Sequence, residues 1–268
     1  MSRRGERGRD AYHDRVAPRY EHIYSDAWWQ WHDGLTWEYL KPLLPADLRA
    51  PVIDLGCGTG KWGRRLLKSG YAVTFLDASA GMLEQARRLV EASGGGDRAS
   101  WVRADLMDLS SLPADHFALA TAMGEPLCST EKPAHALRQI ARCLRPGGVL
   151  VATFDNRVAC LDHYVEQGDL DGLEEFVRTG RTHWLTRDRR EQFEIHTFTA
   201  GQLRGLFARA GLEILGIIGK TVLPMRSCRS LLEDPEVRRR LARIEKRLSG
   251  EPENLGRCAH LQVASRRC

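Results

Sequence analysis

Short apolar runs alternate with segments of helical periodicity along the first half of the chain. Helical spacing of apolar residues is found at 61–69, 80–92 and 133–144. Between these segments lie runs typical of strands buried on both faces, at 52–55, 72–76, 100–102, 117–122 and 149–154. Strands that alternate with helices at this spacing predict an α/β fold with a parallel, doubly wound sheet.

The regular alternation ends after Asp155. A helix is predicted at 199–210, and two strands at 212–218 and 260–264. The polar and aromatic stretch at 156–198 and the segment at 221–258, which contains a basic helix at 235–248, interrupt this pattern. We therefore expect one domain over 46–268 with cap insertions at about 156–198 and 221–258. An aromatic-rich helical segment at 1–45 precedes it, and its charged first residues are expected to form a frayed basic arm.

The most informative segment follows the first predicted strand. Asp54 is followed by glycines at alternate positions, Gly56, Gly58 and Gly60, and then by a helix. Glycine allows a tight turn and the close approach of a ligand to the main chain. The spacing GxGxG differs from the dinucleotide fingerprint GxGxxG, and Lys61 is followed by Trp62 rather than the Ser or Thr of a P-loop.

The form VIDLGCGTG resembles motif I of the class I S-adenosylmethionine (SAM)-dependent methyltransferases, especially those acting on small molecules. FLDAS with GMLEQAR, then RADLMDL, then LRPGGVLVATF match later motifs of that family in the same order. The resemblance implies a Rossmann-like sheet of seven strands with an antiparallel last strand, SAM as the cofactor and a methyl-transfer activity.

The ends of the predicted strands supply groups that suit SAM, because ligands of open α/β sheets bind at the carboxyl ends of the strands. Asp77 is placed to accept from the ribose hydroxyls, and Asp105 from the adenine amine; one such acid alone could simply cap a helix. Asp54 is expected to orient the glycine loop. The predicted cofactor-binding residues are Asp54, Gly56, Cys57, Gly58, Gly60, Asp77, Ala78, Met82, Ala104, Asp105, Leu106 and Met123.

The C-terminal half is similar to the bacterial tRNA methyltransferases that esterify 5-carboxymethoxyuridine at the wobble position. The shared elements are Asn156, a GKTV turn at 219–222 and an LGRxxH segment at 255–260. The chain departs from that family after the fourth strand, where it has GEPL. It also has WWQWH at 28–32 where the family has a basic residue, which His32 could replace.

Residues that contact the acceptor are expected in the two insertions. His163 and Tyr164 are the candidate catalytic base or polar anchor, and the candidate substrate-binding residues are Asn156, His183, Trp184 and Arg226. Ordinary surface polarity is the alternative for each. Three hypotheses follow: methyl transfer to a heteroatom of a small molecule, methylation of the wobble uridine of tRNA, and a non-catalytic SAM-binding protein.

Composition narrows these hypotheses only slightly. The chain has 268 residues and a net charge of +5, and 34 of its 40 basic residues are arginines. Arginine pairs well with phosphate, which is compatible with RNA binding, although a solvated basic surface is the alternative. The seven cysteines form no CxxC pair, so no metal site is expected. No apolar run is long enough for a membrane span and no signal peptide is evident, so a cytoplasmic location is expected.

Overall fold

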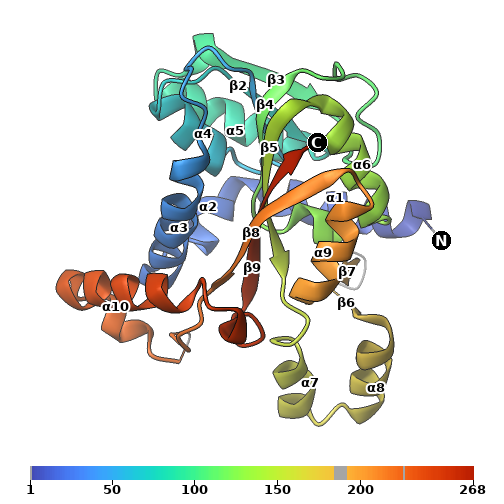
Figure 1. The fold of residues 1–268 in the computed structure, drawn as a ribbon, viewed down its shortest axis with the longest axis vertical. Coiled ribbons are helices and arrows are strands. Elements are labelled where there is room, and N and C mark those ends of the chain that lie inside the picture. The colour runs from blue at the N-terminus through green and yellow to red at the C-terminus, as the bar shows by residue number, and fades with distance from the viewer. Residues whose placement is uncertain (1, 184–191, 226) are drawn as a thin grey trace.

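The computed structural model describes residues 2–183, 192–225 and 227–268. Its centre is a seven-stranded sheet of order β3-β2-β1-β4-β5-β9-β8, flanked by helices (Figure 1). The first five strands are parallel, and β9 pairs antiparallel with both β5 and β8. This confirms the expected fold of seven strands with an antiparallel last strand. No helix among the described residues is long and apolar enough to cross a membrane.

The elements have well-defined bounds. The strands of the sheet are β1 (Val52–Leu55), β2 (Val73–Asp77), β3 (Ala99–Arg103), β4 (Phe117–Ala122), β5 (Leu144–Asp155), β8 (Leu212–Lys220) and β9 (His260–Arg267). A separate hairpin consists of β6 (Arg181–His183) and β7 (Glu194–His196). The helices are α1 (Ser2–Val16), α2 (Tyr20–Ile23), α3 (Ala27–Leu40), α4 (Lys61–Lys68), α5 (Ala80–Ala92), α6 (Pro133–Cys143), α7 (Leu161–Gln167), α8 (Leu170–Thr179), α9 (Ala200–Ala208) and α10 (Pro235–Leu248).

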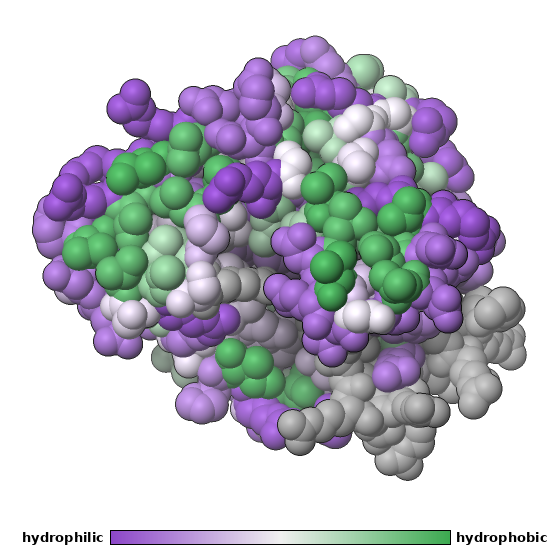
Figure 2. All heavy atoms as spheres, turned by 90° about the horizontal axis from the view of Figure 1, so that it is seen from below, coloured by the Kyte–Doolittle hydropathy of each residue, from purple (hydrophilic) through white to green (hydrophobic). Residues whose placement is uncertain are grey.

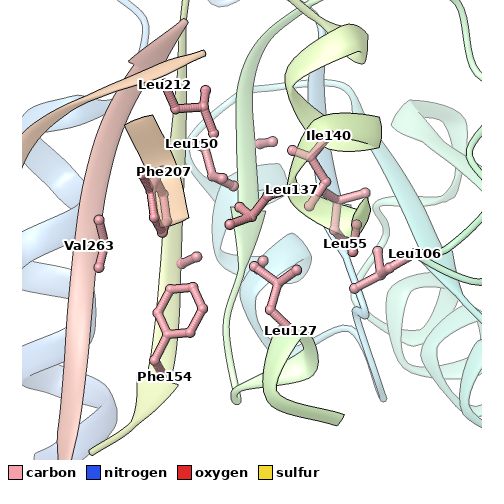
Figure 3. Close-up of a cluster of buried hydrophobic side chains, with 14 of the residues drawn as sticks. Leu55, Leu106, Leu127, Leu137, Ile140, Leu150, Phe154, Phe207, Leu212 and Val263 are labelled. Atoms are coloured by element: carbon pink, nitrogen blue, oxygen red, sulfur yellow. The ribbon is translucent and has the colours of Figure 1, made fainter. Parts of the chain in front are cut away.

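Alternate residues of the strands pack on opposite faces of the sheet. Ile53 and Leu55 point into the cluster that α6 and α9 cover, part of which Figure 3 shows. Val52, which precedes Ile53 and points to the other face, packs in a second cluster with residues of α4 and α5. Both faces of the central strands are thereby buried, and only the strand ends remain available for ligands.

Two parts of the chain differ from the sequence-based expectation. The charged first residues, expected to form a frayed arm, begin helix α1, whose Arg9 is 9% exposed. The 156–198 segment, which shows little periodicity, contains α7 and α8. These short helices expose Val165, Leu170 and Val177, so their apolar positions do not follow the buried stripe that reveals a packed helix. Figure 2 looks from below onto this end of the molecule, where hydrophobic patches interrupt a hydrophilic surface.

Candidate functional site

The glycine loop lies between β1 and α4. Gly56, Gly58 and Gly60 all have positive φ, at 61°, 53° and 78°, which L-residues with a side chain adopt only with strain. A Cβ at Gly58 would meet nothing within 4 Å. At Gly58 the loop therefore presents bare main chain to an open side, as a ligand that lies against the backbone requires.

Asp54 supports this loop from beneath. Its carboxylate accepts a hydrogen bond from Thr121 Oγ1 at 2.7 Å and another from the Gly63 amide in the first turn of α4 at 2.8 Å. Asp54 is 1% exposed, and burial raises the pKa of its carboxyl to about 7. These contacts fit the expected role of orienting the loop.

This pKa gives a testable consequence for Asp54→Asn. An acid whose folded pKa of about 7 exceeds its unfolded value of 3.8 binds its proton more tightly in the folded state. The unliganded wild type therefore loses stability as the pH rises from about 4 to about 7. The amide can still accept from Gly63 and can donate to Thr121, but it does not titrate. Between pH 5 and pH 8 we expect the variant to gain roughly 1–3 kcal/mol relative to wild type in urea unfolding. A constant difference between the two proteins over that range would contradict this account.

Asp77 joins the end of β2 to the glycine loop. Its Oδ2 accepts from the Gly58 amide at 2.8 Å, and its Oδ1 accepts from the Ser79 amide at 2.9 Å. Burial raises the pKa of this carboxyl, while the two amides and the nearby His13 lower it. The structure thus brings together two parts of the predicted cofactor site, the second strand's acid and the loop glycines.

Other predicted cofactor residues surround the same strand ends. The Cys57 amide donates to Leu76 O at 2.9 Å, and the Ala104 amide donates to Asp77 O at 3.2 Å. Met82, Leu106 and Met123 are all buried. Ala78 O accepts from Arg103 Nε at 3.2 Å. The structure therefore gathers all of these residues at the carboxyl edge of the sheet.

Helix α1 contacts this edge, which the sequence did not indicate. Arg9 Nη2 lies 2.5 Å from Asp105 Oδ2, and the Met107 amide donates to Asp105 Oδ1 at 2.8 Å. Asp14, further along α1, accepts from Ser79 Oγ at 2.5 Å and from the Gly81 amide at 3.0 Å. The carboxylate predicted to bind adenine thus pairs with a residue 96 positions away in sequence, a contact that no local pattern could reveal.

The segment after α1 meets the glycine loop and the end of β4. Glu21 accepts from Thr59 Oγ1 at 2.5 Å and from Arg64 Nη2 at 2.9 Å. Glu125 follows β4 with a positive φ of 58°, an unfavourable conformation that often marks a functional position. Its charge adds to burial in raising the pKa of Tyr20 and of Tyr24. Glu125 was not among the predicted site residues, although GEPL marked its position as unusual.

The residues predicted to contact the acceptor lie in different parts of the structure. Asn156 is buried and its Nδ2 donates to the carbonyls of Leu255 at 2.8 Å and Cys258 at 2.6 Å. Tyr164 on α7 stacks on Phe176, donates to Thr182 Oγ1 at 2.8 Å, and contacts His163 edge-to-face. These contacts make the pair part of the α7–α8 unit. His183 is exposed on β6. Trp184 and Arg226 lie outside the described residues.

Beside Asn156, the ends of β5 and β8 meet the start of β9. His260 is opposite Asp155 in one pairing and opposite Lys220 in the other. His32 of α3 packs edge-to-face against His260 with the ring centres 5.2 Å apart. The structure therefore places His32 in this polar cluster, on the strand-end side of α3. Among the described residues, no group of three His, Cys, Asp or Glu residues could hold a metal ion.

Comparison with known proteins agrees with this geometry. Residues 52–148 match the family model of a methyltransferase domain. The chain is similar in fold to a SAM-dependent methyltransferase from Methanosarcina mazei (TM-score 0.61, 18% identity, 85% of this chain and 96% of that one). It is also similar to one from Mesorhizobium loti (TM-score 0.57, 24% identity, 88% and 100%).

The sheet and the structural neighbours show the class I methyltransferase fold. The domain match and the glycine loop indicate a SAM-dependent methyltransferase, with SAM as its cofactor. Among curated relatives, it is 27% identical over 222 residues to the tRNA 5-carboxymethoxyuridine methyltransferase of Escherichia coli K12, covering 80% of each chain. It is 36% identical over 110 residues to the malonyl-[acyl-carrier protein] O-methyltransferase of Enterobacter lignolyticus, covering 41% of each.

Proposed function

We propose that this enzyme methylates the carboxylate of 5-carboxymethoxyuridine at the wobble position of tRNA, forming a methyl ester. One observation carries the proposal: three segments that resemble the wobble-uridine enzymes, far apart in sequence, meet at one corner of the sheet. Asn156 donates to the Leu255 and Cys258 carbonyls, and Lys220 of the GKTV turn lies opposite His260 of the LGRxxH segment. This corner, with the insertions at 156–198 and 221–258, is the proposed acceptor side.

The extent of similarity supports the same acceptor. The tRNA methyltransferase aligns over 222 residues, which extends well beyond the 97 residues, 52–148, of the methyltransferase domain match. The malonyl-[acyl-carrier protein] O-methyltransferase aligns over 110 residues. A relative that shares only the cofactor-binding part says little about the acceptor, because acceptor specificity is set elsewhere on this fold.

The chemistry of a carboxylate acceptor fits the residues at this corner. Bound SAM supplies an electrophilic methyl group on a positively charged sulfur. A carboxylate oxygen attacks without losing a proton, so no general base is required and His163 and Tyr164 need not perform that role. The chain's task is to hold the two reactants in line and to exclude water. The proposed residues for the cofactor are Asp77 and the glycine loop, with the carboxylate of Glu125 close to where positive charge would lie.

Helix α10 offers a surface for an RNA backbone. Its exposed cations lie within an arc of about 120° at 3.6 residues per turn, and they are Arg239, Arg240, Arg243, Lys246 and Arg247. Arg239 pairs with Glu236 at 2.7 Å. The buried Glu245 faces the other way and accepts from the Val222 and Leu223 amides at 2.6 and 3.0 Å. The basic face is thereby fixed to the turn that follows Lys220.

Removing two of these charges tests the RNA surface. We expect Arg243→Ala with Lys246→Ala to raise KM for tRNA about tenfold near 0.1 M salt and to reduce the slope of log K against log salt by about 1–2. The matched control is Arg49→Ala with Lys68→Ala, two exposed cations of which one precedes β1 and the other ends α4. If both double variants raised KM equally, or if neither raised it, α10 would not be part of the acceptor surface.

The proposal itself is tested with tRNA from a strain that lacks wobble-uridine methyl esters. Purified enzyme and SAM should convert 5-carboxymethoxyuridine to its methyl ester, detected by mass spectrometry of digested nucleosides. The alternative is a small-molecule acceptor, because relatives that share only the cofactor-binding part leave the acceptor open. Unchanged tRNA together with methylation in the small-molecule fraction of a lysate would select that candidate instead.

A further inference from the structure

Lys220 is the most unusual charged residue near the strand ends. Its side chain is 1% exposed, and within the described part of the chain its Nζ donates one hydrogen bond, to Thr36 Oγ1 at 3.1 Å. An ammonium group has three donors and carries a large desolvation cost when buried. Burial of such a group is normally compensated by close pairing, which a single hydroxyl does not provide.

Unsatisfied polar atoms surround this lysine. Gln262 donates to Thr36 O at 3.5 Å, but its Oε1 is buried without a hydrogen-bond partner among the described residues. His32 Nε2 is likewise buried and unsatisfied. Each such atom costs about 1–3 kcal/mol, so a group of them in one place calls for a polar occupant.

The charges facing Lys220 come from several elements. Asp33 of α3 is already engaged, because Lys61 Nζ lies 2.8 Å from its Oδ2 and His32 Nδ1 lies 3.3 Å from its Oδ1. Asp155 at the end of β5 is 4.0 Å from His260 Nε2. Glu125, Asp33, Cys258 and Asp155 act on Lys220 through their charges. Asp33 therefore already has Lys61 and His32 as partners, and Asp155 has His260 beside it.

From this arrangement we infer that Lys220 anchors the acceptor's carboxylate, in a site walled by His32 of α3 and Gln262 of β9. The ammonium group supplies a charged hydrogen bond to one carboxylate oxygen and leaves the other free to attack the methyl group. The four-carbon stem lets the amine swing toward Glu125 and the strand ends to meet an entering ligand. This inference rests on the proposed carboxyl methylation and adds the residue that selects an acid.

The test compares an acid with its uncharged amide. An anticodon stem-loop with 5-carboxymethoxyuridine and the same stem-loop with the carbamoyl analogue are titrated by calorimetry. We expect wild type to prefer the acid at least 30-fold and Lys220→Met to reduce the preference below threefold. Thr36→Val is the matched control, since it removes the hydroxyl partner but keeps the charge, and should retain the preference.

Two further readouts separate an anchor from a structural lysine. Replacing a poorly paired buried charge by an apolar isostere should leave Tm unchanged or raise it, and SAM affinity should stay within twofold. Should Lys220→Met fail to fold, Lys220→Gln carries the same test. An acid preference above tenfold in the folded variant would overturn the inference.

Phenoxyacetate, which carries the same ether-acetate arm, tells the two proposals apart. If tRNA is methylated while Lys220→Met keeps its preference for the acid, the proposed function is supported and the role of Lys220 as the anchor is contradicted. A different result would be that tRNA is not methylated, while wild type binds phenoxyacetate and Lys220→Met does not. This would support the carboxylate site and contradict tRNA as the substrate.

Discussion

Asp77→Ala is expected to weaken SAM binding by well over tenfold. In the unliganded protein, this carboxylate already accepts from the Gly58 and Ser79 amides, which fixes its position beside the glycine loop. Its remaining lone pairs can accept from the two ribose hydroxyls. Charged hydrogen bonds contribute about 1.5–3 kcal/mol each, and the alanine variant loses them while the ribose is still buried. Calorimetric titration with SAM measures the loss directly.

Asp108→Ala is the matched control for that experiment. Asp108 also accepts from the amide two residues ahead, that of Ser110 at 3.0 Å, but it is exposed on the loop after β3. We expect its variant to bind SAM as wild type does. Both variants should remain folded by circular dichroism. Unchanged affinity in a folded Asp77→Ala protein would place the cofactor elsewhere.

Gly63→Val is expected to destabilise the protein by more than about 3 kcal/mol or to prevent folding. A Cβ at this position would lie 2.1 Å from Cε1 and 2.6 Å from Cζ of Phe75, the fully buried aromatic of β2. Phe75 is held in turn by stacking on Trp101. Relief of the clash would move α4 away from the sheet, which would also break the hydrogen bond from the Gly63 amide to Asp54.

Gly34→Ala is the control that shows the effect of replacing a helical glycine where no neighbouring side chain lies close. Gly34 is also helical, in α3, but a Cβ there would meet nothing within 4 Å. Alanine should stabilise that helix by about 0.5–1 kcal/mol, because it has less conformational freedom to lose. Urea unfolding of both variants gives the comparison. A Gly63→Val protein as stable as wild type would mean that α4 does not press on Phe75.

The parts of the site that the sequence revealed are those built from local patterns. The glycine loop, Asp54 and Asp77 follow apolar runs directly, and their chemistry depends on the turn that the glycines permit. The structure adds contacts that depend on tertiary packing. Arg9 reaches Asp105 across 96 positions. Neither the hydrophobic periodicity nor a sequence motif predicts such a pairing, because it depends on how α1 packs against the sheet.

Glu125 and Lys220 illustrate the same limit at the acceptor side. Glu125 is distinguished by a positive φ, which depends on the turn after β4 and on Thr153 Oγ1, which accepts from the Gly124 and Glu125 amides. Lys220 belongs to a recognisable turn, but its burial depends on α3 and β9 packing over it. Antiparallel pairing of β9 with β5 and β8 brings Asn156, Lys220 and His260 to one corner, so topology assembles the proposed acceptor site.

The lability of the transferred methyl group tests carboxyl methylation most directly. Methyl-labelled SAM would be incubated with the enzyme and with tRNA that contains 5-carboxymethoxyuridine, and the recovered tRNA would be treated with mild alkali. Esters hydrolyse under these conditions, whereas methyl groups on ring nitrogen, ring carbon or ribose oxygen remain. The account predicts label in tRNA that is released as volatile methanol. Label that resists alkali, or tRNA that takes up none, would contradict it.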